Sequence, residues 1–304
     1  MKLINRLLSK ISSKIKYSIG LSHILNLRPK YKRIKNINDL DFKVFSQNGE
    51  DGIIDYLLFS LNIDKPKFIE IGVGDYSECN TRFIFERSSP KGLIVDCIEN
   101  LSNKISKNIK LTNGDIIILE KLISSENINS ILKKYDFDKN VDLFSLDIDG
   151  IDYWVLKELP KDFSKVAVIE FNSTFGSKKA VTVPNQKSFN RTKSHYSNLY
   201  FGASLKAIVD LMKKKNFVFV GTDLFRINAF FVSKKYIKKI KLNIPKYKNL
   251  YKFTNSNIRE SRSKKYSLTY LSGKNKIKKI YDCNIVDVSN RLKKNLKIKD
   301  LFKY

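Results

Sequence analysis

The sequence has few cysteines and contains no long apolar run. Its three cysteines, Cys79, Cys97 and Cys283, show neither the spacing of metal ligands nor an even-numbered disulfide framework, which favours a reducing, cytoplasmic compartment. Nowhere do about 18 apolar residues follow one another, so no transmembrane helix is expected. The first residues also lack the uninterrupted apolar stretch and small-residue cleavage site of a signal peptide.

Acidic residues are missing from one end of the chain and scarce at the other. Residues 1–38 carry ten Lys and Arg and no Asp or Glu, and residues 233–304 carry 22 Lys and Arg against four acidic residues. The middle, residues 39–232, has 26 of each, so the net charge of +28 belongs to the two ends. We therefore divide the chain into a basic arm (1–38), a neutral domain (39–232) and a lysine-rich extension (233–304).

The arm begins with an amphipathic pattern. Apolar residues recur at spacings of three and four, as in Leu7, Ile11, Ile15 and Ile19, and the basic residues fall largely on other faces. This spacing predicts a helix. Two interpretations stay open. The helix either adsorbs to an anionic membrane, peripherally on its inner face, or packs on its own domain or on a partner.

Strand and helix patterns alternate through the neutral domain. Apolar runs typical of buried strands occur at residues 67–72, 91–98, 109–119, 141–152 and 165–173, with helical patterns between them. Such alternation implies right-handed crossovers and a mainly parallel α/β sheet. Residues 216–232 then contain two strands around a turn. The expected fold is a Rossmann-like, mainly parallel sheet closed by a C-terminal antiparallel hairpin.

Glycines and carboxylates follow the first two predicted strands. Gly72 and Gly74 allow the backbone to approach a ligand, and Asp96 is placed to accept hydrogen bonds from both ribose hydroxyls of an adenosine. A dinucleotide is disfavoured, because Ser77 replaces the third glycine of its motif and Glu70 would repel a pyrophosphate. S-adenosylmethionine has cationic amino and sulfonium groups, which suit an acidic strand end better.

Four segments resemble the FkbM-like class I methyltransferases. They are SQNGEDGI (46–53), FIEIGVGDYSECNT (68–81), KGLIVDCIE (91–99) and LFSLDIDGIDYWVL (143–156). The resemblance spans residues 44–232 and leaves both basic ends unexplained. It implies a class I methyltransferase sheet, S-adenosylmethionine as the cofactor, and an acceptor among the sugars of cell-surface polysaccharides or natural products. Glu70 stands where that family usually has aspartate, and Asp96-Cys97 where Glu-Pro is common.

The resemblance also implies roles for individual residues. It assigns cofactor binding to Gln47, Glu50, Glu70, Gly72, Gly74, Asn80, Asp96 and Asp115. Among these, Asp96 would hold the ribose, Asp115 would lie near the adenine, and Gln47 and Glu50 would reach over the amino-acid moiety. Other roles stay open, because Glu50 also suits a helix cap and Asp115 also suits the turn after Asn113-Gly114.

Three aspartates, Asp147, Asp149 and Asp152, lie within six residues where the fourth predicted strand ends. Crowded carboxylates raise one another's pKa, so one of them could act as a general base on a hydroxyl. Two of them could instead hold Mg²⁺, which prefers oxygen ligands. Asp147 and Asp149 are the catalytic candidates, and the metal ligands if a metal binds. A structural alternative is that Asp149 or Asp152 caps the next helix.

A polar segment, residues 180–205, follows the fifth predicted strand and is too long for a plain connector. We expect it to form a lid over the acceptor. His195 is a candidate base, because imidazole exchanges a proton near neutral pH. The candidates for acceptor binding are Glu170, Asn172, Arg191 and Tyr200.

These observations favour an S-adenosylmethionine-dependent O-methyltransferase. Its expected acceptor is a sugar hydroxyl of a surface polysaccharide or of its nucleotide- or lipid-linked precursor. One alternative is a nucleic-acid methyltransferase whose basic ends bind phosphates, but the core is neutral and no [DN]-P-P-[YFW] box occurs. Another is a non-catalytic membrane-surface binding protein, against which the intact glycines and strand-end carboxylates argue.

Overall fold

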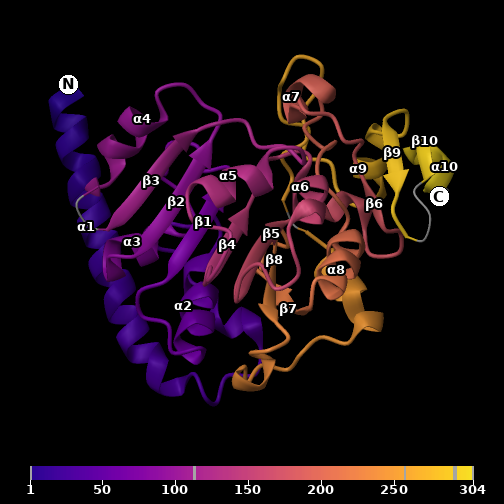
Figure 1. Cartoon of the computed structure of the whole chain (residues 1–304). Coiled ribbons are helices and arrows are strands. Elements are labelled where there is room, and N and C mark those ends of the chain that lie inside the picture. Colours follow the sequence, from indigo (N-terminus) through magenta and orange to yellow (C-terminus); the bar gives the residue numbers. More distant parts are fainter. Residues whose placement is uncertain (1, 112–113, 257, 290–292, 303–304) are drawn as a thin grey trace.

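A seven-stranded sheet forms the centre of the molecule (Figure 1). The computed structural model describes residues 2–111, 114–256, 258–289 and 293–302, and their side chains except those of 2–11 and 293–295. The strands of the central sheet are β1 (Lys67–Ile71), β2 (Lys91–Asp96), β3 (Asp115–Glu120), β4 (Leu143–Leu146), β5 (Val166–Glu170), β7 (Phe217–Thr222) and β8 (Asn228–Ser233). Their spatial order is β3-β2-β1-β4-β5-β8-β7.

The pairing of these strands confirms the expected fold class. Strands β1 to β5 pair in parallel, so their carboxyl ends meet at one edge of the sheet. Strand β8 is antiparallel to both β5 and β7, which makes residues 217–233 the predicted hairpin. The result is a Rossmann-like, mainly parallel sheet closed by an antiparallel hairpin.

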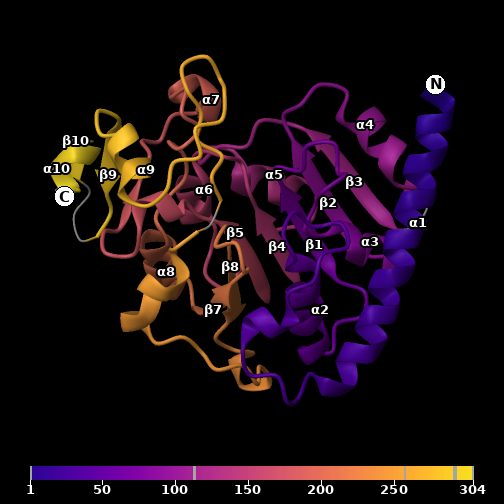
Figure 2. The same ribbon diagram turned by 180° about the vertical axis from the view of Figure 1, so that it is seen from behind.

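Helices cover both faces of the sheet (Figures 1 and 2). Neighbouring residues of a strand point to opposite faces. Ile69 therefore packs in the same cluster as Leu156, whereas Phe68 packs in the cluster that contains Leu57 and Phe85. One face is covered by α2 (Glu50–Ser60), α3 (Arg82–Ser88) and α4 (Leu101–Asn108), and the other by α5 (Ile128–Lys134), α6 (Asp152–Glu158) and α8 (Leu205–Lys214).

The third predicted strand is displaced in the structure. The sequence pattern places it at residues 109–119, around a turn at Asn113-Gly114, but β3 is Asp115–Glu120. Asn113 lies outside the described residues. Three consecutive β-branched residues, Ile116 to Ile118, follow the glycine and favour a strand there, so the strand begins after the turn rather than spanning it.

The predicted N-terminal helix is present as α1 (Lys2–Leu27), which runs along one side of the molecule (Figures 1 and 2). Ile24 is buried in a small cluster with Val44, Phe45 and Phe83. On the other side of the helix, Ile15 and Ile19 are 54% and 65% exposed. Within the described part of the chain, no helix has the length and apolar character needed to cross a membrane.

The extension, which the sequence left without a definite structure, joins the lid segment in a second sheet. This sheet has the order β10-β9-β6 and consists of β6 (Val181–Thr182), β9 (Asn284–Asp287) and β10 (Lys293–Lys297). The remaining helices are α7 (Arg191–Ser194), α9 (Lys274–Lys279) and α10 (Ile298–Leu301). Among the described residues, the 3₁₀ turns include η1 (Arg28–Lys30), η2 (Ile37–Leu40), η4 (Ser173–Phe175), η5 (Ile237–Lys239) and η6 (Tyr247–Phe253).

Candidate functional site

A cavity of about 630 Å³ opens where the carboxyl ends of β1, β2 and β4 meet. Its volume lies within the range of small-molecule sites. The segments after these three strands line it, together with part of the lid. The predicted site residues that line it are Gln47, Glu70, Gly72, Gly74, Asn80, Asp96, Asp147, Asp149 and Arg191. Parallel-strand ends thus bring together groups from distant parts of the sequence.

The turn after β1 depends on two glycines with positive φ. At Gly72, φ is +87° and a Cβ would lie 1.5 Å from the backbone oxygen of Asp147. Only glycine fits there, because β1 and the end of β4 approach so closely. Gly74 has φ of +56° and no atom within 4 Å of the Cβ position, so it faces open space. Its bare backbone forms part of the cavity wall.

Asp96 fixes this turn from the neighbouring strand end. One carboxylate oxygen accepts hydrogen bonds from the backbone N–H groups of Val73 and Gly74, both at 2.8 Å. The other accepts from the N–H of Ile98 at 3.1 Å. The side chain is partly exposed in the cavity. A carboxylate held in this way is positioned before any ligand arrives.

Glu70 is buried beneath the cavity and organises the segment that follows the turn. It accepts hydrogen bonds from the backbone N–H of Asn80 at 2.8 Å and of Thr81 at 3.0 Å, and another from the Thr81 hydroxyl. Burial raises the pKa of Glu70 to about 7, against the opposing effect of these hydrogen bonds. Asn80 in turn donates to the Ser145 hydroxyl at 3.0 Å, which ties this segment to β4.

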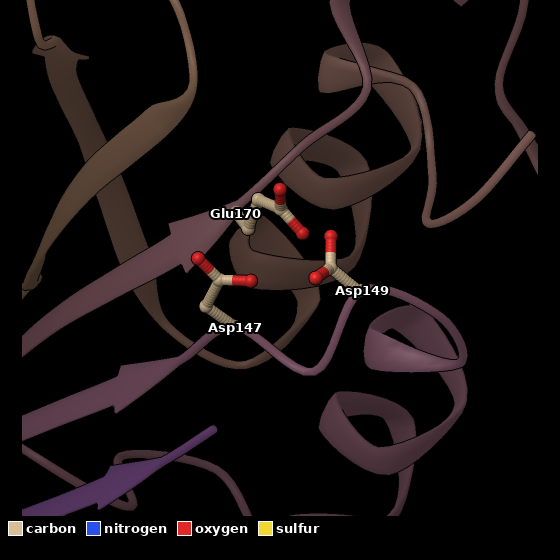
Figure 3. Close-up of side chains that lie close together, drawn as sticks. All are labelled: Asp147, Asp149 and Glu170. Atoms are coloured by element: carbon tan, nitrogen blue, oxygen red, sulfur yellow. The ribbon is translucent and has the colours of Figure 1, made fainter. Parts of the chain in front are cut away.

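Three carboxylates converge beside the cavity (Figure 3). Asp147 and Asp149 follow β4, Glu170 ends β5, and one oxygen from each lies within 4.8 Å of the others. Glu170 is only 5% exposed. Burial raises the pKa of both Asp147 and Glu170, and repulsion by the neighbouring carboxylates adds to the shift. Burial and mutual repulsion therefore favour the neutral form of these two carboxyls, and a cation beside them would favour the charged form.

Arg191 connects the lid to this group of carboxylates. Its guanidinium forms an ion pair with Asp149, donates to the backbone oxygen of Asn198 at 2.9 Å and lies 3.7 Å from the centre of the Phe201 ring. Burial lowers the pKa of Arg191, but the carboxylates, above all Asp149, outweigh it and raise the pKa. The guanidinium is thus held by the lid and by the strand end together.

A second, smaller cavity of about 80 Å³ adjoins the first and shares Gln47 and Arg191 with it. Glu170 lines it from the central sheet. Ile258 and Lys276 line it from the extension, a contribution that sequence reasoning missed. No sequence motif marks this contribution, because Ile258 and Lys276 are far from the lid in the sequence and come close to it only in the folded chain.

Three of the polar residues singled out in the sequence are buried and make structural hydrogen bonds, and among them only Asn172 lines a described cavity, the smaller one. Glu50, the first residue of α2, accepts from the N–H groups of Asn48 and Gly49 and does not line either described cavity. Its carboxylate also accepts from the Asn228 side-chain amide at 2.8 Å, and because α2 has no side-chain cap hydrogen bond, Glu50 holds the preceding turn and does not cap the helix. Asn172 donates to the backbone oxygens of Leu199 and Phe201, and Asp152 accepts from the N–H groups of Ile148 and Gly150.

Asp115 does not reach the cavity. It is the first residue of β3 and pairs with Lys91, the first residue of β2, so it lies at the opposite edge of the sheet. The prediction that it lies near the adenine is therefore wrong, and the cause is the displaced strand. Lys121, Leu122 and Ile123 follow the carboxyl end of β3 and line the cavity in its place.

His195 and Tyr200 also lie outside both described cavities. The Nδ1 of His195 lies 2.7 Å from the Ser197 hydroxyl, and its ring stacks on Tyr196. Burial, and to a smaller degree Lys279, lower its pKa. Tyr200 is buried and donates to the backbone oxygen of Asn284 at 2.6 Å, which joins lid and extension. This geometry gives Tyr200 no contact with an acceptor in the cavities.

Comparisons with known proteins find similarity at the level of solved structures alone. No protein-family model and no curated protein matches the sequence. An O-methyltransferase family protein from Burkholderia thailandensis aligns at 12% identity and a TM-score of 0.37, over 72% of this chain and 71% of that one. Human N-acetylserotonin methyltransferase, in complex with S-adenosylmethionine, aligns at 12% identity and 0.33, over 58% of this chain.

A third structure, a coclaurine N-methyltransferase, aligns at 10% identity and a TM-score of 0.33, over 71% of each chain. The chain spans only 50% of the human enzyme. At these identities and scores, the similarity carries no argument about activity or cofactor. The assignment of the fold therefore rests on the strand order and pairing described above.

Proposed function

We propose that the protein is an S-adenosylmethionine-dependent O-methyltransferase. One observation carries the proposal: Gly72, Gly74 and Asp96 line a single cavity at the carboxyl ends of adjacent parallel strands. Open-sheet folds of this kind bind nucleotide-like ligands at that edge. The open space beside Gly74 fits a ligand that approaches the bare backbone. The four segments that resemble FkbM-like methyltransferases support the same cofactor.

The charge of the cavity fits this cofactor. Glu70, Asp96, Asp147 and Asp149 all line it, and a cationic amino-acid end is favoured beside them. When bound, S-adenosylmethionine supplies an electrophilic methyl group. A pyrophosphate-bearing dinucleotide is disfavoured, because its negative charges would face these carboxylates.

The acceptor is proposed to be a sugar hydroxyl of a surface polysaccharide or of its activated precursor. The resemblance to the FkbM-like family supports this class. Glu170 and Arg191 line the smaller cavity beside the cofactor cavity, so an acceptor would enter from that side. Carboxylates of the Asp147, Asp149 and Glu170 group are better placed than His195 to take the hydroxyl proton, because His195 does not line the described cavities.

We also propose that α1 docks the enzyme on an anionic membrane surface. The helix packs on the domain through Ile24 and through Tyr17, whose ring centre is 6.2 Å from that of Phe83. Ile15 and Ile19 lie on the other side and are exposed. The ten basic residues of 1–38, without an acidic residue, complement an anionic surface. Packing and membrane docking therefore use different faces of one helix.

Calorimetry with S-adenosylmethionine and S-adenosylhomocysteine, in the presence of EDTA, tests the cofactor. We expect one site per chain, and we expect Asp96→Ala to weaken binding by about 100-fold, or roughly 2.7 kcal/mol. The loss has two sources, because Asp96 both faces the ligand and holds the N–H groups of Val73 and Gly74. Asp115→Ala is the matched control at the opposite edge of the sheet and should bind as the wild type does. Absence of binding to the folded wild type would refute the proposal.

A further inference from the structure

The carboxylates of Asp147, Asp149 and Glu170 point toward a common centre (Figure 3). One oxygen from each lies within 4.8 Å of the others, a separation that a single ion between them can bridge. Glu170 ends β5 and Asp147 directly follows β4, which pairs with β5, so the ends of two paired strands position these two carboxylates. Asp149 lies in the loop after β4, where it forms an ion pair with Arg191.

The negative charge of this group is only partly balanced by the described residues. Arg191 pairs with Asp149, whose side chain is 53% exposed. Glu170 is 5% exposed, and its Oε2 has no hydrogen-bond partner within the described part of the chain. An unpaired buried carboxylate oxygen is costly. Independently of the clustering, Glu170 therefore offers an unpaired buried oxygen to a positively charged or hydrogen-bond-donating ligand.

We propose that Asp147, Asp149 and Glu170 bind one divalent cation of the Mg²⁺ or Mn²⁺ class. The donors are carboxylate oxygens alone, which these hard cations prefer. Zinc is disfavoured, because the group contains no histidine or cysteine.

The position of the cation defines the acceptor class, an inference that rests on the proposed methyl transfer. Asp147 and Asp149 line the larger cavity, and Glu170 lines the smaller one. The cation lies at their boundary, with coordination positions left for two adjacent acceptor oxygens, as in a vicinal diol of a sugar. A hydroxyl bound to a divalent cation loses its proton more readily, so a carboxylate of the group can accept it.

Manganese titration of the full-length protein tests the site without cofactor. Protein freed of metal with EDTA is titrated with Mn²⁺, and the free ion is measured by electron paramagnetic resonance. We expect one site per chain, with affinity at least about tenfold weaker in Glu170→Gln and in Asp149→Asn. Asp115→Asn, at the other edge of the sheet, should bind like the wild type.

The same titration can overturn the proposal. If the folded wild type binds no Mn²⁺ up to about 1 mM, the weak end of carboxylate sites, the group holds a shared proton and no metal. If Glu170→Gln binds as tightly as the wild type, the site lies elsewhere. Asp149 is half exposed, so Asp149→Asn keeps the test valid even where a buried variant fails to fold. Thermal melts establish that each variant is folded.

The acceptor class is tested separately, by water-proton relaxation of bound Mn²⁺. A methyl glycoside with a vicinal diol should displace water from the ion and lower the relaxation, whereas its monodeoxy analogue should have a smaller effect. Equal effects of the two sugars contradict the diol inference. Because metal binding is measured without S-adenosylmethionine, and cofactor binding with EDTA, failure of one proposal is distinguishable from failure of the other.

Discussion

At the scale of single residues, Gly72 and Gly74 occupy similar positions in the motif, but the physical reasons that favour glycine at the two positions differ. Both have positive φ, which costs an L-residue about 1–2 kcal/mol. Only at Gly72 would a Cβ also collide with backbone, at 1.5 Å from the Asp147 oxygen. The sequence motif predicts both glycines, but the difference between them comes from the packing of β1 against the end of β4.

Alanine substitutions at these two positions should therefore differ in their effect on stability. We expect Gly72→Ala to lower the free energy of unfolding by roughly 4 kcal/mol or to prevent folding, because strand ends must move apart. Gly74→Ala should cost only about 1–2 kcal/mol. Urea unfolding followed by circular dichroism measures both. Equal losses would mean that the close approach at Gly72 is not maintained in solution.

At the scale of elements, α1 has one face packed on the domain and one exposed face. Ile15 and Ile19 are four residues apart and share one side of the helix, whereas Tyr17, midway between them, lies on the other. Helical periodicity alone left packing and membrane docking as alternatives, because it does not tell which face meets the domain. The buried position of Ile24 and the exposure of Ile15 and Ile19 separate the two faces.

Substitutions on the two faces should affect different measurements. We expect the full-length protein to bind vesicles that contain anionic phosphatidylserine, and to bind less as salt is raised. Ile15→Ser combined with Ile19→Ser should weaken binding at least about tenfold, because about 3 kcal/mol of apolar burial is lost. The control Ile24→Ser should lower the melting temperature and leave vesicle binding unchanged. Absence of binding at low salt would contradict membrane docking.

At the scale of the whole molecule, the extension supports the lid. Val181 of β6 pairs with Asp287 of β9, and the N–H of Val288 donates to the backbone oxygen of Ala180 at 2.8 Å. Ile285 is fully buried in the cluster shared by lid and extension. The lid therefore lies between the central sheet and the extension.

Weakening this interface should loosen the lid selectively. We expect Ile285→Ala to cost about 2–4 kcal/mol locally and to speed hydrogen exchange of residues 180–204, while β1, β4 and β5 stay protected. Leu268→Ala, at an exposed position of the extension, is the control and should leave exchange unchanged. Faster exchange of the central sheet to the same degree would show that lid and sheet unfold together.

Most of the central fold was predictable, because buried strands and amphipathic helices leave local periodic patterns. The errors arose where local signals conflicted. The run at residues 109–119 contains both a turn and a strand, so the predicted strand boundary differs from the observed one. Because β3 begins at Asp115, this residue lies at the edge of the sheet opposite the cavity. The imidazole of His195 makes it a candidate base, but its chemistry does not fix the direction in which a lid residue points, and His195 lies outside the described cavities.

The sequence by itself determined the class of the sheet, the glycine turn and the carboxylate at the end of β2, because strand patterns and short motifs are encoded by residues close together in the chain. The tertiary structure alone decided that Glu170 meets Asp147 and Asp149, that Asp115 lies apart from the cavity, and that the lysine-rich extension supports the lid. These are contacts between distant residues. They depend on the order in which strands pair and on the path of the lid, neither of which leaves a local pattern.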